Sequence, residues 1–193
     1  MSRLVITNNL TLDGVMQSPS HPDEDRRGGF EHGGWAAPYA DQVMADFMAK
    51  RIEKGGTMLF GRRTYEQFAS YWPHQPDDNP YAAVLNNRQK YVVSTTLSDP
   101  LPWAKSARLD GVEAVARLKE ELSGDMGVLG SGELAQALMR HGLVDEYVLS
   151  IHPLVLGSGR RLFPEGSPFA KLRLVDSVTT TTGVVIGTFE ADS

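Results

Sequence analysis

The sequence contains no cysteine among its 193 residues. Disulfides, thiolate metal sites and a cysteine nucleophile are therefore excluded, and so is a zinc deaminase of the P-C-x-x-C type. No apolar run approaches the length of a transmembrane helix. The first residues turn polar too soon for a secretory signal. We therefore expect a cytoplasmic protein with no membrane partner.

The sequence also lacks a basic stripe. Its formal net charge is -5, and its 19 lysines and arginines are spread along the chain, so we expect no nucleic-acid partner. The 5 histidines show no ligand spacing such as H-x-x-x-H, so we expect no metal site. Hydrophobic residues make up 41% of the chain and charged residues 22%, which is typical of globular proteins. Residues 1–193 are thus expected to form a single domain.

Strand-like and helix-like segments alternate along most of the chain. Short apolar runs predict buried strands at residues 4–6, 57–60, 91–94 and 126–129. Amphipathic spacing predicts helices at residues 39–54, after Gly61, at 112–122 and at 133–141. After Asp145 only strand-like segments follow, at residues 147–151, 172–178 and 184–189. The pattern predicts an α/β fold with a mixed, mainly parallel central sheet flanked by helices, and antiparallel C-terminal strands.

The first candidate binding element is the strand-to-helix turn at Gly61. A helix start offers free backbone N–H groups and a positive dipole end where a phosphate can bind. Arg62 and Arg63 add positive charge, and Thr64 adds a hydroxyl within the first helical turn. A capped helix start with solvated arginines explains the junction equally well, because Thr64-x-x-Gln67 fits a capping box. Both interpretations stay open from the sequence.

The second candidate is the turn Gly130-x-Gly132-x-x-Ala135, which matches a loose dinucleotide fingerprint. An ordinary glycine turn is its alternative. A Rossmann unit would place this turn after the first strand, with an acidic residue at the end of the next strand. Neither condition holds here, so the Rossmann interpretation is excluded.

In combination, these parts resemble the dihydrofolate reductase family. Residues 58–66 resemble the strand-to-helix motif of that family, and residues 128–132 resemble its second glycine turn. Residues 145–153, 157–159 and 162–163 are more similar to the reductase domain of riboflavin biosynthesis, the RibD C-terminal domain, and its single-domain relatives. The resemblance covers nearly the whole chain and implies a dihydrofolate-reductase-like fold.

The resemblance implies that NADPH binds at the carboxyl ends of the central strands. The residues expected at its phosphates are Gly61, Arg62, Arg63, Thr64, Gly130, Ser131, Gly132, Glu133 and Leu134. Ser94 and Thr95 match the family position that holds the adenosine ribose and its 2'-phosphate. Arginine and hydroxyl groups beside a 2'-phosphate favour NADPH over NADH.

The resemblance also implies the reaction, hydride transfer to a C=O or C=N bond of a small pyrimidine- or pterin-like substrate, as in 5-amino-6-(5-phosphoribosylamino)uracil reductase. Asp13 is the candidate catalytic and substrate-binding residue, with a turn aspartate as the alternative. Trp35 and Trp72 are candidate substrate-binding residues, although core packing explains aromatic residues as well. The loop at residues 17–34 corresponds to a loop that closes over the nicotinamide, and a disordered insertion is the alternative.

Other classes of protein fit less well. Acyl transfer through a G-x-S-x-G elbow and phosphoryl transfer through G-x-x-x-x-G-K-[ST] both lack their motif. The alternative to a reductase is a non-catalytic nucleotide-binding or self-associating module on the same fold. The C-terminal strand segments present an edge that must be covered or paired, and we therefore expect a homodimer.

Overall fold

The computed structural model describes residues 2–76 and 78–192 and divides into two compact units. The first unit comprises Met1–Ile6 and Met48–Asp145, and the second comprises Thr7–Phe47 and Glu146–Ser193. Strand β1 (Leu4–Thr11) and helix α1 (Gln42–Lys54) contribute residues to both units. The chain therefore crosses between units inside these two elements and again just before β6.

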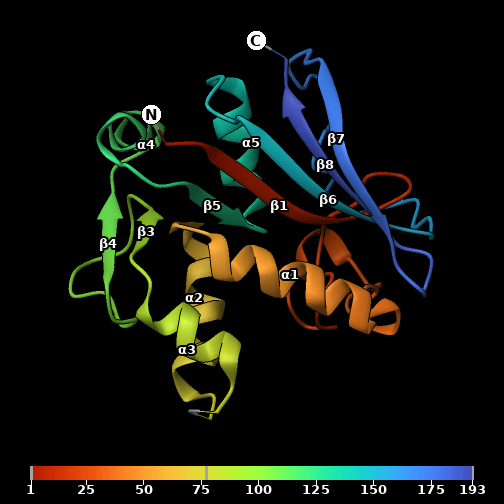
Figure 1. Cartoon of the computed structure of the whole chain (residues 1–193), viewed down its shortest axis with the longest axis horizontal. Helices are drawn as coiled ribbons and strands as arrows, with labels where there is room; N and C mark the ends of the chain where they lie inside the picture. Colours follow the sequence, from red (N-terminus) through yellow and green to blue (C-terminus); the bar gives the residue numbers. More distant parts are fainter. Residues whose placement is uncertain (1, 77, 193) are drawn as a thin grey trace. The chain divides into compact units, whose positions relative to one another are not determined.

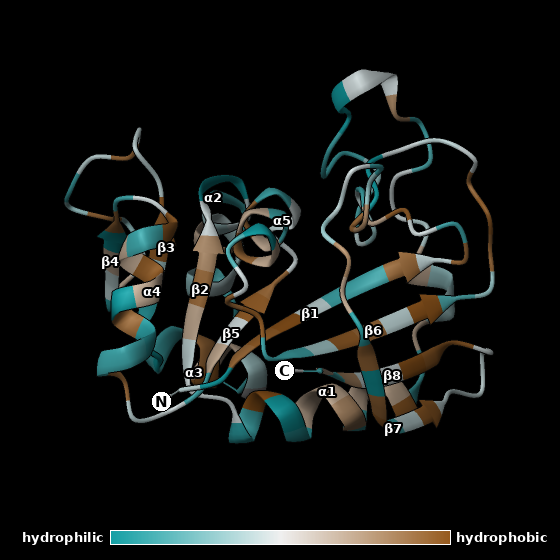
Figure 2. Cartoon of the chain, turned by 90° about the horizontal axis from the view of Figure 1, so that it is seen from above, coloured by the Kyte–Doolittle hydropathy of each residue, from teal (hydrophilic) through white to brown (hydrophobic). Residues whose placement is uncertain are grey.

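The first unit contains a parallel sheet. Its strands follow the order β4 (Ser106–Leu109), β3 (Lys90–Val93), β2 (Thr57–Gly61), β5 (Met126–Leu129) and the start of β1. Figure 1 labels β4, β3, β5 and β1, and Figure 2 also labels β2. The pairs β2–β3, β2–β5 and β3–β4 are all parallel. Gly61 lies opposite Val93 in this register. The turns that follow β2 and β3 therefore lie at one edge of the sheet, where the carboxyl ends of parallel strands meet.

Helices connect these strands, as the alternation in the sequence predicts. They are α2 (Arg62–Tyr71), α3 (Pro80–Asn87), α4 (Val112–Glu121) and α5 (Gly132–Arg140), with a short 3-10 helix η3 (Trp72–His74) after α2. In Figure 2, β2 is mostly brown and α2 mostly teal, because the strand is buried and the helix carries charged residues outward. The helix α3 and the strand β4 are additions to the elements predicted from the sequence.

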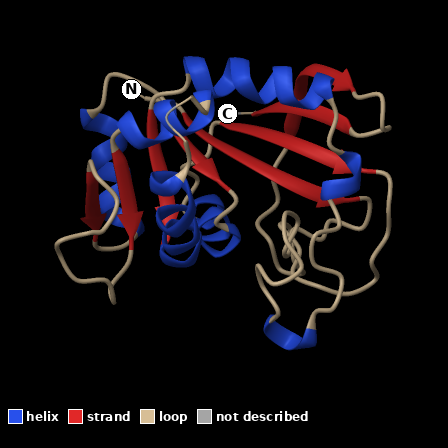
Figure 3. Cartoon of the chain, turned by 90° about the horizontal axis from the view of Figure 1, so that it is seen from below, coloured by secondary structure: helices blue, strands red, loops and turns tan. Residues whose placement is uncertain are grey.

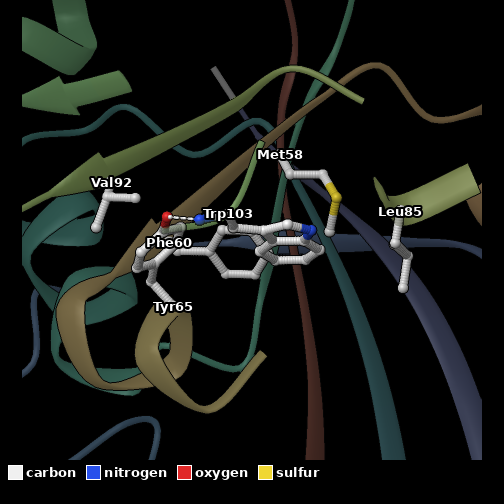
Figure 4. Close-up of a cluster of buried hydrophobic side chains, with 6 residues drawn as sticks. All are labelled: Met58, Phe60, Tyr65, Leu85, Val92 and Trp103. Carbon is white, nitrogen blue, oxygen red and sulfur yellow. Dashed lines mark hydrogen bonds between the residues drawn. The ribbon is translucent and has the colours of Figure 1, made fainter. Parts of the chain in front are cut away.

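Apolar side chains from β2, β3, α2, α3 and the segment before β4 form a core cluster in the first unit. Its buried members are Met58, Phe60, Tyr65, Leu85, Val92 and Trp103 (Figure 4). Phe60 and Tyr65 both pack their rings against Trp103, at centroid distances of 6.0 and 6.2 Å. The Tyr65 hydroxyl also accepts a hydrogen bond from the Trp103 backbone N–H at 3.0 Å. The cluster therefore fixes α2, the helix that begins at the Gly61 turn, to the sheet.

The second unit contains the rest of β1 followed by β6 (Glu146–His152), β8 (Val185–Ala191) and β7 (Leu172–Thr179) in that strand order. The pairs β6–β8 and β7–β8 are antiparallel, with an irregularity in β7 between Leu174 and Asp176. This confirms the prediction of antiparallel C-terminal strands. With the parallel strands of the first unit, it confirms the α/β fold with a mixed, mainly parallel sheet.

The long loop of the second unit packs on a small apolar core. Figure 3 draws it among the tan loop segments. Val15, Phe30 and Trp35 are buried together there. The Gln17 side chain donates to the carbonyls of Asp25 and Arg27 at 3.1 and 2.9 Å. The loop contains one 3-10 helix, η1 (Arg27–Gly29), and a second, η2 (Ala37–Tyr39), follows it. Residues 17–34 thus form a hydrogen-bonded loop with packed apolar anchors.

Candidate functional site

The structure brings the two predicted glycine turns together in the first unit. The Gly61 N–H donates to the Ser131 hydroxyl at 3.1 Å, and that hydroxyl lies 3.3 Å from the Leu129 carbonyl oxygen. A methyl group added at Gly61 would lie 3.6 Å from the Leu134 Cβ atom and 3.8 Å from the Ser131 Cβ atom. The turn after β2 and the turn after β5 therefore form one element, with glycine where they approach each other.

The helices that leave these turns begin without a side-chain cap. Gly61 is the N-cap of α2 and Ser131 the N-cap of α5, and neither helix start has a side-chain capping hydrogen bond. Thr64 lies within the first turn of α2, so the capping box considered as an alternative does not form. Ser131 adopts a left-handed conformation with φ 48°. Both helix starts therefore present backbone N–H groups and a positive dipole end.

Arginines stand beside these helix starts. Arg62 pairs with Glu66 at 3.2 Å one turn further along α2, and Arg63 pairs with Glu133 of α5 at 3.9 Å. The arginine side chains are 42% and 51% exposed. Exposed ion pairs contribute little to stability, so either guanidinium can turn from its carboxylate to a bound anion at small cost.

Ser94 lies at the end of β3 and is buried, whereas Thr95 is exposed. The Ser94 hydroxyl accepts hydrogen bonds from the backbone N–H groups of Thr96 and Leu97 at 3.2 and 3.1 Å. The Arg108 guanidinium donates to the Ser94 carbonyl at 3.2 Å. The sequence did not indicate Arg108, because its strand β4 has no apolar run that would reveal it.

Asp13 lies in the second unit, where its carboxylate organises a loop. It accepts hydrogen bonds from the Thr11 hydroxyl at 2.6 Å and from the backbone N–H groups of Leu156 and Gly157 at 3.2 and 2.9 Å. Arg161 adds an ion pair at 3.4 Å. The Thr11 hydroxyl, and less strongly the two backbone groups, lower the pKa of Asp13 below its usual value. The carboxylate is therefore ionised at neutral pH, and its hydrogen bonds hold residues 156 and 157 beside the turn at Asp13.

The two predicted tryptophans have defined surroundings. Trp35, in the second unit, is buried and donates its indole N–H to the Gln17 carbonyl at 2.7 Å. Trp72, in the first unit, is half-buried and packs edge-on against the rings of Phe68 and Tyr71, with centroid distances of 6.2 and 5.1 Å. Packing accounts for both positions, and their role toward a substrate stays a prediction.

His152 is a buried histidine that its spacing in the sequence does not distinguish from the other four. His152 lies at the end of β6, and its Nδ1 atom is 3.0 Å from the Ser150 carbonyl oxygen. The rings of Trp35 and Tyr39 stand nearly perpendicular to it, at centroid distances of 5.1 and 5.5 Å. Burial lowers the pKa of His152, so the ring is neutral at neutral pH.

The chemistry of the first unit suits a dinucleotide phosphate. Uncapped backbone N–H groups, glycine turns and arginines are the groups that hold phosphate oxygens in proteins. Over residues 2–76 and 78–192, no cluster of three or more histidine, aspartate or glutamate side chains could hold a metal ion. Within the same part of the chain, no helix is long and apolar enough to cross a membrane.

Solved structures show what class of fold this is. A Shewanella sp. PV-4 protein provisionally assigned to riboflavin biosynthesis superposes with a TM-score of 0.72 at 21% identity, covering 99% of each chain. Dihydrofolate reductase from Enterococcus faecalis, solved with NADP(H) and RAB-propyl, superposes with a TM-score of 0.62 at 13% identity, covering 99% of this chain and 97% of that one. The fold is therefore dihydrofolate-reductase-like, as the resemblance in the sequence implied.

The family follows from the sequence comparison. The RibD C-terminal domain family matches residues 3–186, and the chain belongs to this reductase-type family. The Bacillus subtilis protein YyaP, itself uncharacterised, is 29% identical over 186 residues, which is 95% of this chain and 92% of YyaP. The expected family is thus confirmed.

Proposed function

We propose that the chain is an NADPH-dependent reductase that transfers a hydride to a C=O or C=N bond of a small pyrimidine- or pterin-like substrate. The observation that carries this proposal is the pairing of the two glycine turns through Gly61 and Ser131, with an uncapped helix start on each. The NADP(H) complex of the Enterococcus faecalis reductase supports the choice of cofactor. The proposal also places the protein in the cytoplasm as a homodimer. Its mass in solution, measured by light scattering, would test the dimer.

The residues of the first unit have separate tasks in this proposal. The N–H groups at the starts of α2 and α5, with Gly61, Thr64 and the residues from Gly130 to Leu134, bind the phosphates. Arg62 and Arg63 neutralise their charge. Ser94 and Thr95 hold the adenosine ribose and its 2'-phosphate. Bound NADPH would supply a hydride to the carbon of the substrate double bond, and the oxygen or nitrogen of that bond would take a proton from solvent.

The proposal gives Asp13 a positioning role, and its catalytic role stays a prediction. An ionised carboxylate that already accepts several hydrogen bonds is a poor proton donor. We therefore propose that Asp13 holds the loop around Leu156 and Gly157 in place on the substrate side. The proton would come from another source, such as solvent.

The variant Gly61→Ala tests the cofactor site without disturbing the fold. The Gly61 backbone, with φ -77° and ψ 158°, is accessible to alanine, and the added methyl group meets its neighbours only at ordinary contact distances. The methyl would occupy the space between the turns, where the backbone must approach a phosphate. We expect the Kd for NADPH to rise by about tenfold or more with little change in unfolding free energy.

Gly124→Ala is the matched control, because a methyl group there meets nothing within 4 Å. Binding is measured by titration calorimetry and turnover by NADPH oxidation over pterins, pyrimidines, imines and quinones. NADPH binding with no turnover on any substrate would favour the non-catalytic module. A wild-type protein that binds neither NADPH nor NADH would refute the proposed function.

A further inference from the structure

A buried histidine of the second unit uses its two ring nitrogens differently. His152 ends β6, and its side chain is 0% exposed. Its Nδ1 atom lies 3.0 Å from the Ser150 carbonyl oxygen and 3.3 Å from the Leu10 carbonyl oxygen of β1. Carbonyl oxygens only accept hydrogen bonds, so Nδ1 carries the proton of the neutral ring and Nε2 is an acceptor. Among the described residues, this Nε2 atom has no hydrogen-bond partner.

Two aromatic residues that precede α1 pack against this imidazole. The rings of Trp35 and Tyr39 contact it at centroid distances of 5.1 and 5.5 Å, and both stand nearly perpendicular to it. Trp35 is itself buried with Val15 and Phe30 in the small apolar core of the second unit. The imidazole therefore lies between the backbone of β1 and β6 and the aromatic side chains of residues 35–39.

The same aromatic segment closes the loop at residues 17–34. The Trp35 indole N–H donates to the Gln17 carbonyl at 2.7 Å, and the Ala36 backbone N–H donates to the Pro19 carbonyl at 2.9 Å. These two bonds join the end of the loop to its beginning. If Trp35 leaves the imidazole, its indole N–H loses its buried position and the closure of the loop is disturbed.

The elements around the imidazole offer it no counter-charge within the described part of the chain. Strand β1 and residues 35–40 contain no charged side chain, and Tyr39 is the titratable group in contact with the ring. The charged groups on or beside the surrounding elements have no hydrogen bond or ion pair with the imidazole: Asp13, Asp41, Glu146, Arg161 and Glu190. A proton on Nε2 would therefore create a buried charge whose N–H has no acceptor, which is costly. Burial accordingly lowers the pKa of His152 from its usual value of 6.5, and the Ser150 and Leu10 carbonyls oppose this effect less strongly.

We propose that His152 is a proton-sensitive latch for the loop at residues 17–34. The neutral ring holds Trp35 and Tyr39 on β6, and protonation of Nε2 releases them. In the released state the imidazolium reaches water, where its second N–H finds an acceptor. The latch lies within the second unit, so the proposal goes beyond the proposed reductase function and does not depend on cofactor binding.

Hydrogen exchange of the Trp35 indole N–H and the Ala36 amide, followed by NMR on the whole chain, tests the latch. Exchange rates corrected for their intrinsic pH dependence report the equilibrium constant for opening. We expect this constant to rise by up to about tenfold between pH 7.5 and pH 5.5, because the open state binds a proton near pH 6.5 and the closed state does not. His152→Asn should remove the rise, because asparagine keeps a donor near the Nδ1 position and has no group that titrates.

His21→Asn is the matched control, since it removes an exposed histidine from the same loop, and it should keep the wild-type pH dependence. A rise that persists in His152→Asn, or that is absent from the wild type, would overturn the latch. Thermal unfolding checks that each variant is folded. NMR titration of the ring nitrogens of His152 in the wild type provides a second measurement, in which we expect the proton on Nδ1 and a pKa below 6.5. A pKa of 6.5 or above would overturn the proposal even if His152→Asn does not fold.

Discussion

The Tyr65 hydroxyl provides a stringent test of how the core supports α2. Tyr65 is fully buried, and its hydroxyl oxygen accepts the backbone N–H of Trp103 at 3.0 Å (Figure 4). Trp103 is only 2% exposed, so water cannot replace a lost acceptor without entering the core. The substitution Tyr65→Phe keeps the ring and removes only the oxygen. It leaves the Trp103 N–H buried without this partner.

The expected cost follows from that geometry. A buried donor that loses its acceptor destabilises a protein by about 1–3 kcal/mol, whereas an exposed hydroxyl is worth little. Tyr71→Phe is the control on the same helix, because the Tyr71 side chain is 54% exposed. We expect Tyr71→Phe to change the unfolding free energy by less than about 0.5 kcal/mol.

Urea unfolding followed by circular dichroism measures both variants. Tyr65→Phe should shift the midpoint without changing the m-value, since the exposed surface on unfolding is nearly the same. For a chain of this length, each 1 kcal/mol corresponds to about 2–4 °C in Tm. If Tyr65→Phe is as stable as Tyr71→Phe, the hydrogen bond to Trp103 does not support the core as described.

Two further predictions concern strained and buried groups of the first unit. Ser131 has a left-handed backbone, which glycine adopts without strain. Ser131→Ala should therefore be about 1 kcal/mol less stable than Ser131→Gly, since both variants lose the hydrogen bond with Gly61. Equal denaturation midpoints of the two variants would contradict this strain. Burial, followed by the charge of Lys105, lowers the pKa of Lys90 to about 8 from its model-peptide value of 10.5. The folded state therefore loses this proton before the unfolded state does, and between pH 8 and 10.5 the wild type should gain up to about 3 kcal/mol of stability relative to Lys90→Met. A stability difference that stays constant over this range would contradict the shifted pKa.

Periodicity in the sequence was sufficient to predict most elements, because their buried faces are apolar. The strand β4 escaped because Ser106–Leu109 is half-buried throughout and carries no apolar run. The helix α3 does carry a start signal in the sequence. Asn79 precedes Pro80, and the Asn79 side chain caps the helix by accepting the N–H groups of Tyr81 and Ala82.

The candidate site was predictable to different degrees. The glycine turns could be found because a strand, a glycine and a helix start are adjacent in the sequence. The bond between Gly61 and Ser131 joins residues 70 positions apart, and no local pattern indicates it. The hydrogen bond from Arg108 to the Ser94 carbonyl depends on β4, and the sequence did not predict that strand. The contacts of Asp13 with residues 143 and 144 positions away were equally invisible.

The surroundings of Asp13 bear differently on the two parts of the proposed function, cofactor binding and reduction of a substrate. The Thr11 hydroxyl and backbone N–H groups lower the pKa of the Asp13 carboxyl, so in the proposal Asp13 positions a loop and is not the proton donor. Every group proposed to bind the phosphates lies in the first unit and Asp13 lies in the second, so the proposal gives Asp13 no part in phosphate binding. The proposal that the chain binds NADPH therefore stands on the joined turns at Gly61 and Ser131. The proposal that it reduces a substrate rests on the family, and in that proposal the proton comes from a source other than Asp13.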